Sequence, residues 1–226
     1  MVGCGIATIS RGVWEMHFEF LTEDQSSAKA MDALVPKLIG EEITYRIHSY
    51  KGVGRIPKGL RPRSDASKRI LLDQLPKILR GYGNTSYCDV VIVICDLDDK
   101  DKQSFLTDLQ KVLDTCDKKP KTLFCLAIEE FEAWYLGDLS AVRKAYPKAK
   151  ANVLGSYVND SICGTWELLA DAVYKGGSKA LAKKGWQAVG EQKSIWAEQI
   201  SIHMIVEANL SPSFNEMITQ LRSVAV

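Results

Sequence analysis

The sequence predicts an α/β protein, with a parallel four-stranded sheet flanked by helices and a helical C-terminal appendage. Residues 90–95 and 122–128 form apolar runs that end in acidic residues, which is typical of strands buried on both faces of a parallel sheet. Strand-like and helical patterns alternate in a β-α-β-α order up to about residue 138, as in parallel sheets with crossover helices. Beyond that point the pattern is helical and irregular.

Length and composition limit the function classes. The chain has 226 residues, enough for one sizeable core or a core with an appendage. Its hydrophobic fraction of 46% and charged fraction of 25% are ordinary for a globular protein, and a net charge of +1 indicates no particular partner. The cysteines show no Cys-x-x-Cys spacing, which favours a reducing compartment over a disulfide framework or zinc site. Without a signal-peptide pattern or long apolar run, we expect a cytoplasmic protein.

The first two strands bracket a helix. Polar residues alternate with apolar ones over 15–21, which predicts a strand. Apolar residues at helical spacing predict a helix over 26–39, and β-branched and aromatic residues predict a second strand over 43–50. Glu23 therefore lies at a strand-to-helix turn. A simpler alternative is that Glu23 is a first-turn acid favoured by the helix dipole.

A basic loop follows the second strand, before a helix that ends near residue 79. It contains several glycines and prolines, and almost all of its charges are positive. Loops of this length inside compact domains are more often functional than not, and arginines suit phosphate contacts. A solvated surface loop is the alternative, and its Gly-Val-Gly matches no nucleotide-binding pattern. The candidate phosphate-binding residues are Lys51, Arg55, Lys58, Arg61 and Arg63.

The central strand, 89–98, ends in a run of aspartates. In an extended segment Asp96 and Asp98 point to the same side. Two carboxylates about 4 Å apart repel by roughly 4 kcal/mol at an effective dielectric constant near 20, so such a pair attracts a cation. Oxygen ligands favour Mg²⁺, Mn²⁺ or Ca²⁺. Asp99 or Asp101 alternatively caps the next helix, which leaves the first two aspartates available.

A helix over 101–116 leads to the buried strand 122–128, which again ends in acidic residues. Because the carboxyl ends of parallel strands share one edge of a sheet, acids that follow different strands converge there. We therefore expect one metal centre formed by Glu23, Asp96 and Asp98, with Glu130 or Glu132 at its margin.

The C-terminal appendage is predicted to contain helices over 139–146, 166–174, 194–208 and 213–224. A basic stretch with Trp186 beside it lies between the second and third of these helices. This combination suits a nucleic-acid backbone and a stacked base, although an exposed lysine-rich turn has the same composition. The candidate nucleic-acid-binding residues here are Lys179, Lys183 and Lys184.

The ordered acids resemble those of the Toprim domain of topoisomerases, primases and overcoming-lysogenization-defect nucleases. Glu23 matches the glutamate after the first strand, and 96–98 match the later Asp-x-Asp. The details resemble more closely a small Toprim-like bacterial family, known mainly as a domain of unknown function and often encoded beside ABC- or SMC-like ATPases in phage-defence settings. Residues 130–138 resemble its Glu-x-Glu-Ala-Trp followed by Asp, and 211–214 resemble its Ser-x-Ser-Phe. Asp24 departs from the glycine of many Toprim domains, and could narrow the turn or add a ligand.

This resemblance implies a Toprim-like catalytic core over 1–138, with a helical region over 139–226 packed on it. It implies a Mg²⁺- or Mn²⁺-dependent nuclease acting on DNA or RNA, as the effector of an anti-phage system with an ABC- or SMC-like ATPase partner. Asp96 and Asp98 would hold Mg²⁺, and Glu23 would be a metal ligand or general base.

Two other functions fit parts of the pattern. Haloacid-dehalogenase-like phosphatases share Asp-x-Asp after an apolar strand, but their motif usually opens the domain, whereas a full β-α-β-α unit precedes it here. The non-enzymatic alternative is a metal-binding module that docks on an ATPase.

Overall fold

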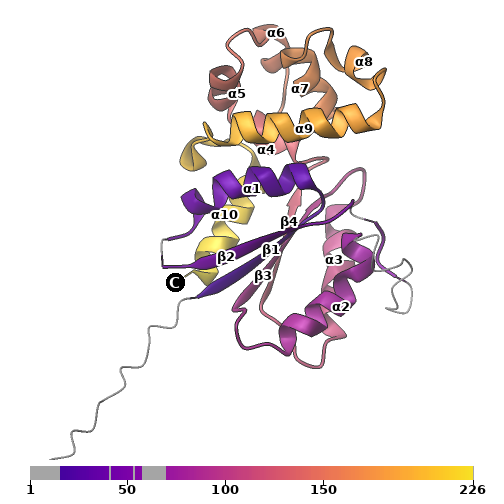
Figure 1. Cartoon of the computed structure of the whole chain (residues 1–226), viewed down its shortest axis with the longest axis vertical. Coiled ribbons are helices and arrows are strands. Elements are labelled where there is room, and N and C mark those ends of the chain that lie inside the picture. The colour runs from indigo at the N-terminus through magenta and orange to yellow at the C-terminus, as the bar shows by residue number, and fades with distance from the viewer. Residues whose placement is uncertain (1–15, 41, 53, 58–69, 226) are drawn as a thin grey trace, which may run out of the picture.

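The computed structural model describes residues 16–40, 42–52, 54–57 and 70–225. Four parallel strands form one sheet in the order β2-β1-β3-β4 (Figure 1), which confirms the predicted α/β class and the parallel four-stranded sheet. Each strand lies within two residues of its expected bounds: β1 (His17–Thr22), β2 (Thr44–Ser49), β3 (Val90–Asp96) and β4 (Thr122–Ala127).

Burial on both faces of the sheet explains why an apolar run predicted the central strand. β3 lies between β1 and β4, and residues 90–95 are buried on both faces of the sheet. Val91 and Val93 pack towards one face, whereas Ile92 and Ile94 pack towards the other. A strand in that position has no solvent-facing side, so its sequence is continuously apolar rather than alternating.

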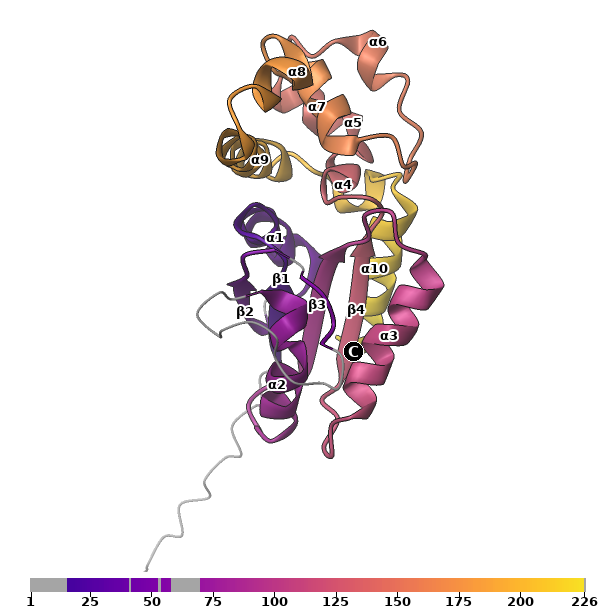
Figure 2. The same cartoon turned by 90° about the vertical axis from the view of Figure 1, so that its right-hand side faces the viewer.

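Helices cover both faces of the sheet (Figure 2). One face packs against α1 (Gln25–Leu38) and α10 (Pro212–Val224), and the other packs against α2 (Leu71–Gly83) and α3 (Lys102–Asp114). The last helix of the chain therefore lies in the layers around the sheet.

The order in which successive strands are added to the sheet reverses between β1 and β3. These strands are neighbours, but β1 is followed by α1 on one face and β3 is followed by α3 on the other. Open α/β sheets bind ligands at such a point, beside the carboxyl ends of the two strands. The fold therefore indicates a ligand-binding site at the residues directly after Thr22 and at the end of β3.

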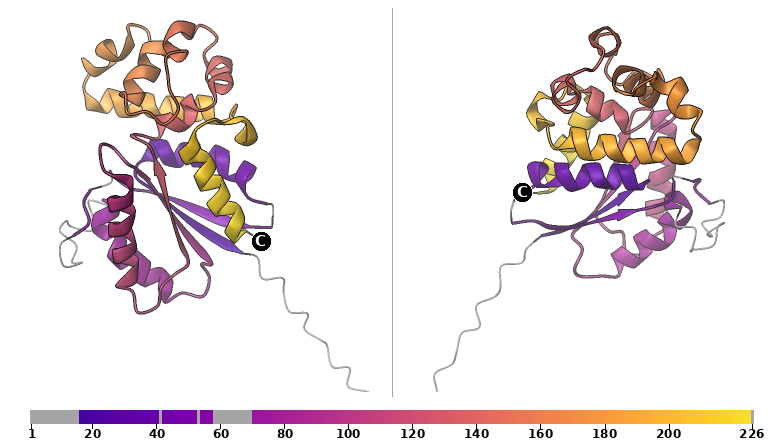
Figure 3. Two further views of the ribbon diagram at one scale, coloured as in Figure 1. Left: turned by 180° about the vertical axis from the view of Figure 1, so that it is seen from behind. Right: turned by 45° about the horizontal axis from the view of Figure 1, so that its top comes forward.

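A helical cap, defined as α4–α9, lies outside α1 (Figure 3). Its longest helix runs along α1, and Lys37 of α1 donates hydrogen bonds to the carbonyl oxygens of Ser201 (2.9 Å), Ile202 (2.9 Å) and Met204 (3.0 Å). A short 3-10 helix, η3 (Val206–Ala208), leads from the cap to α10. The cap helices are α4 (Glu132–Leu136), α5 (Leu139–Ala145), α6 (Ala151–Leu154), α7 (Thr165–Val173), α8 (Gly177–Ala182) and α9 (Trp186–Ser201).

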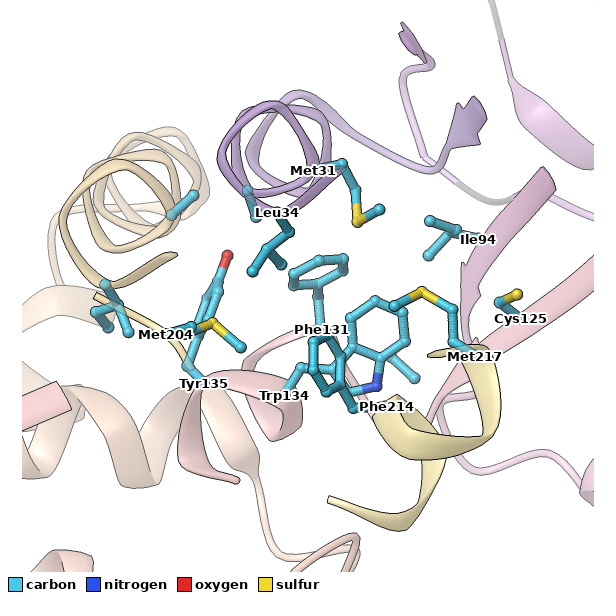
Figure 4. Packing of buried hydrophobic residues seen from close by; sticks show 14 of the residues in the cluster. Met31, Leu34, Ile94, Cys125, Phe131, Trp134, Tyr135, Met204, Phe214 and Met217 are labelled. Atoms are coloured by element: carbon cyan, nitrogen blue, oxygen red, sulfur yellow. The ribbon is translucent and has the colours of Figure 1, made fainter. Parts of the chain in front are cut away.

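An aromatic cluster joins the cap to the sheet (Figure 4). The rings of Phe131 and Trp134 are 4.5 Å apart between centroids, and the rings of Trp134 and Phe214 are 5.4 Å apart. The indole nitrogen of Trp134 donates a hydrogen bond to the Ser213 hydroxyl at 3.0 Å, so this buried polar group is satisfied. One apolar core therefore extends from the strands through α4 and α10 into the cap.

The expected helix over 194–208 is wrong in its bounds, because α9 begins at Trp186 and ends at Ser201. The short α8 was not expected, because its residues were placed in the basic stretch between two predicted helices. Gly176 and Gly177 both have positive φ values, which let the chain turn sharply into that helix. Within the described part of the chain, no helix is long and apolar enough to cross a membrane.

Candidate active site

Glu23 and Asp96 meet at the carboxyl edge of the sheet. Glu23 follows β1 and Asp96 ends β3, and the backbone N–H of Asp96 donates a hydrogen bond to Oε2 of Glu23 at 3.2 Å. The two residues are 73 positions apart in the sequence. Their proximity follows from the pairing of the two strands, because residues that follow adjacent parallel strands emerge at the same edge.

Asp96 has an unfavourable environment for a negative charge. Burial raises the pKa of Asp96 well above its ordinary value, and the negative charges of Glu23, Glu132 and Asp24 raise it further, against the opposing effect of Lys193. Desolvation and like charges both favour the protonated acid. A strongly perturbed carboxyl group at a ligand-binding edge is a recognised mark of a functional site.

Lys193 of α9 lies among the acids at the end of β4. Its ammonium nitrogen is 3.2 Å from Oε2 of Glu132 and 3.3 Å from Oε2 of Glu130. Burial alone would lower the pKa of Lys193, but Glu132, Glu130, Asp96 and Asp24 together raise it above its ordinary value. The lysine is therefore a permanent cation inside this acidic cluster, which consists of Glu23, Asp24, Asp96, Glu130 and Glu132.

Glu132 is the most deeply buried acid of the cluster, with a side chain only 3% exposed. Burial raises the pKa of Glu132, and Lys193 counteracts this effect. Oε2 of Glu132 lies 3.2 Å from the ammonium nitrogen of Lys193, and no other described group donates a hydrogen bond to this oxygen. A carboxylate oxygen can accept more than one hydrogen bond, so this oxygen retains capacity for a ligand beside Lys193.

Asp24 has a structural role at the start of α1. It is the N-cap of α1, and its carboxylate accepts hydrogen bonds from the Ser27 N–H at 2.7 Å and the Ser26 hydroxyl at 2.8 Å. The backbone of Asp24 is extended, which is normal for an N-cap. The aspartate therefore fixes the start of the helix that follows Glu23.

Asp98 does not share the geometry of Asp96. The expectation of one extended segment through both residues is wrong, because β3 ends at Asp96 and Asp98 has a φ of 52°. Its backbone N–H donates to the carbonyl of Glu129 at 2.9 Å, and its carboxylate pairs with Lys100. Asp101 caps α3 by accepting a hydrogen bond from Ser104 N–H at 2.8 Å, as the capping alternative predicted.

Glu129 has a structural role that sequence reasoning did not identify. Its carboxylate accepts hydrogen bonds from the backbone N–H groups at the start of α7: Cys163 at 3.1 Å, Gly164 at 2.8 Å and Thr165 at 3.0 Å. The φ of Glu129 is 62°, so its backbone lies in the left-handed region. This residue anchors the cap to the end of β4 and is not available as a ligand.

A family model described as "Domain of unknown function (DUF4276)" matches residues 22–222. The chain belongs to this family. Because the match spans Glu23, Asp96 and Lys193, the acidic cluster and the lysine lie within the DUF4276 domain itself. Searches among curated proteins and among solved structures returned no match.

The acidic cluster is not a preformed cage. Among the residues that the structure describes, no group of three or more His, Cys, Asp or Glu side chains is arranged to hold a metal ion. Mg²⁺, however, commonly takes only one or two protein carboxylates and completes its octahedron with water and substrate phosphate. The pair formed by Glu23 and Asp96, with the Glu132 carboxylate close enough to affect the pKa of Asp96, suits that mode of binding.

The basic loop begins beside the acidic cluster in this DUF4276 protein. The N–H of Gly52 donates to the carbonyl of Glu23 at 2.9 Å, and Lys51 and Arg55 are both exposed. Lys51, next to Gly52, is therefore held near the end of β1, whereas the N–H of Arg55 donates to Oδ1 of Asp73 in α2 at 3.4 Å. The other predicted phosphate-binding residues of the loop lie outside the described residues: Lys58, Arg61 and Arg63.

The second basic stretch lies on the helical cap. Lys179, Lys183 and Lys184 are exposed, and the ammonium group of Lys184 donates to the Tyr174 hydroxyl at 2.7 Å. Trp186 is 80% exposed, and its ring centroid is 6.4 Å from that of Trp166. The predicted combination of lysines and an accessible aromatic ring is therefore present on the surface.

Proposed function

We propose that this DUF4276 protein is a Mg²⁺- or Mn²⁺-dependent phosphodiesterase that cleaves DNA or RNA. The observation that supports it best is the meeting of Glu23 and Asp96 at the carboxyl ends of β1 and β3, where the strand order of the sheet reverses. Acids held together there, with cationic residues at the start of the neighbouring loop, suit a phosphate substrate and a divalent cation.

Glu23 and Asp96 would hold the cation, with Glu132 at the margin. When bound, the cation would neutralise charge on the phosphate and lower the pKa of a coordinated water. Asp98 would join only after its carboxylate turned away from Lys100. The repulsive environment of Asp96, whose pKa is raised by burial and by the charges of Glu23, Glu132 and Asp24, is the feature of the chain that fits this cation.

The protein's own groups would supply the remaining chemistry. Glu23 is the candidate general base, because a carboxylate fixed by the Asp96 N–H can accept a proton from an attacking water. The ammonium of Lys193 would stabilise negative charge that develops on the phosphate oxygens. Lys51 and Arg55 would hold the flanking backbone phosphates, because both are exposed at the start of the basic loop, which begins beside the end of β1.

A non-catalytic module that docks on an ATPase is the second candidate. The observation that favours it is the ion pairing of Lys193 with Glu130 and Glu132, because a lysine already neutralises part of the cluster. In either case we propose an ABC- or SMC-like ATPase as the partner and anti-phage defence as the setting.

Digestion of a nucleic-acid panel tests the proposal. The parent protein would be incubated with single-stranded DNA, duplex DNA and transfer RNA in Mg²⁺, Mn²⁺ or EDTA, with and without an ABC- or SMC-like ATPase. We expect metal-dependent cleavage that Asp96→Asn abolishes and that Glu23→Gln slows about 10²- to 10⁴-fold. Asp99→Asn, at an exposed neighbouring position, is the matched control and should cleave like the parent. Equal cleavage by Asp96→Asn and the parent would contradict the proposed site, and absence of cleavage in every condition would favour the docking module.

A further inference from the structure

A pocket separate from the acidic cluster lies between the edge strand β2 and helix α2. It has a volume of about 490 Å³, and aromatic and polar side chains line it: His48, Tyr50, Gln74, Lys77, Tyr82 and Tyr87. None of these residues belongs to the acidic cluster. The pocket opens on the face of the sheet that packs against α2 and α3.

Backbone hydrogen bonds connect the segment after β2, which lines the pocket, to the segment after β1, which carries Glu23. Tyr50 follows β2, and its N–H donates to the carbonyl of Thr22 at 3.1 Å, directly before Glu23. Two residues further on, Gly52 donates to the carbonyl of Glu23 at 2.9 Å. The segment that contributes Tyr50 to the pocket is therefore hydrogen-bonded to the segment that carries Glu23.

Gln74 is the feature that marks the pocket as a binding site. It lines the pocket and is only 7% exposed, yet its amide nitrogen has no hydrogen-bond partner in the described part of the chain. Buried amides are almost always hydrogen-bonded, because an unpaired donor loses its contacts with water without replacement. A ligand with a hydrogen-bond acceptor would satisfy this group.

The remaining side chains that line the pocket favour a ligand with a flat ring and an attached negative charge. Three tyrosines and a histidine supply ring faces, and Nε2 of His48 is held at 2.6 Å from Oε2 of the buried Glu19. Lys77 lines the pocket, and exposed Lys51 continues the positive charge towards Glu23. Stacking surfaces, an amide that can pair with a base edge, and nearby cations are the components that proteins use to bind an unstacked nucleotide.

We propose that this pocket binds one unpaired base of a single-stranded nucleic acid whose backbone reaches Glu23 and Asp96. The inference rests on the proposed function and deepens it, because it assigns single strands or unpaired regions as the substrate class. A base inside a duplex remains stacked and paired, so it cannot enter the pocket.

Binding measured in EDTA tests the inference without requiring cleavage. Fluorescence anisotropy would compare a labelled single-stranded oligonucleotide, as DNA and as RNA, with its duplex and with versions that carry one abasic nucleotide at successive positions. We expect single strands to bind more tightly than duplexes, and an abasic nucleotide at one position to weaken binding about tenfold.

Two substitutions connect that effect to the pocket. Gln74→Met preserves the volume of the buried side chain and removes the amide, and Tyr87→Ala removes a ring that is already 53% exposed. Each should weaken single-strand binding about five- to tenfold and abolish the position-dependent loss at the abasic nucleotide. Gln110→Met, at an exposed glutamine on α3, is the matched control and should bind like the parent.

Several results would overturn the inference: equal affinity for single strands and duplexes, no abasic position effect, or parent-like binding by both pocket variants. Failure of the proposed function has a different signature, because the parent would then bind single strands through the pocket and cleave none of them in Mg²⁺ or Mn²⁺.

Discussion

At the scale of single residues, Lys193 explains how several acids can occupy one small region. It pairs with Glu130 and Glu132, and Asp96 and Asp24 contribute to raising its pKa above the ordinary value against the opposing effect of burial. Buried charges without a partner cost several kcal/mol each, so the lysine offsets a large penalty in the protein without a bound cation.

Replacement of Lys193 should therefore destabilise the fold. Lys193→Met keeps most of the aliphatic chain but leaves Glu130 and Glu132 without their cation, and we expect a loss of up to about 3–5 kcal/mol in the free energy of unfolding. Lys111→Met is the matched control, because Lys111 forms an exposed pair with Asp108 that contributes about 1 kcal/mol or less. Urea unfolding of both variants checks the difference, and equal midpoints would contradict a buried role for Lys193.

The sequence predicts part of the acidic cluster. Glu23 and Asp96 were predicted because each directly follows a recognisable buried strand, whereas Asp98 has left-handed backbone geometry that its position after the strand does not reveal. Lys193 was missed, although a signal exists: it is four residues after Val189 and three before Trp196, both buried, so it lies on the inward face of α9.

At the scale of secondary-structure elements, acidic side chains from outside a helix bind the starts of three helices, α7 and α8 of the cap and α10 beside the sheet. Glu129 binds the first N–H groups of α7, and Asp171 accepts a hydrogen bond from the N–H of Ser178 in α8 at 2.6 Å. Asp160 likewise accepts from the N–H of Ser213 in α10 at 2.6 Å. The first N–H groups of a helix have no partner within the helix, so these carboxylates stabilise both the helices and the connections between them.

Glu129→Ala should loosen the contact between β4 and the cap. The variant loses a carboxylate that accepts three backbone hydrogen bonds, and we expect a loss of about 1.5–3 kcal/mol in the free energy of unfolding, with faster amide hydrogen exchange in α7. Asp101→Ala removes the local N-cap of α3 and should cost about 1 kcal/mol without affecting α7. Unchanged exchange in α7 of Glu129→Ala would show that this carboxylate does not hold the helix.

Elements with strong periodicity were predictable, whereas the shortest helices were not. The strands and the long α1, α3 and α10 follow from apolar runs and helical spacing. α4 and α8 are too short to establish a period. Their positions depend on tertiary contacts, which Trp134 of α4 makes with α10 and Asp171 makes with the start of α8. The first half of α9 was missed because 186–193 contains few apolar residues, and its inward lysine weakens the pattern.

At the scale of the whole molecule, one continuous core joins the sheet to the cap. Phe214 of α10 contacts Trp134 of α4, and both belong to the same cluster of buried residues as Phe20 of β1 and Trp196 of α9. A core shared in this way couples the stability of the two regions, so we expect them to unfold together.

Phe214→Ala should lower the stability of the entire protein. The substitution leaves a cavity between α10, α4 and the sheet, and we expect a loss of about 3–5 kcal/mol in the free energy of unfolding. Circular dichroism and tryptophan fluorescence should still report one coincident transition. Leu210→Ala, at a side chain that is 68% exposed, is the control and should change stability by about 0.5 kcal/mol or less. Two separate transitions in the parent would contradict a single cooperative core.

The most direct test of the account is a Mg²⁺ titration of thermal and urea unfolding, in the parent, in Asp96→Asn and in the exposed control Asp99→Asn. A cation bound by Glu23 and Asp96 in the folded state alone should stabilise the parent and the control by about 2.7 kcal/mol at a concentration about 100 times Kd. Asp96→Asn should match or exceed the parent in stability without Mg²⁺, because a charge in a repulsive environment is removed, and should gain almost nothing from the ion. Equal stabilisation of Asp96→Asn and the parent by Mg²⁺ would place the cation elsewhere and contradict the proposed site.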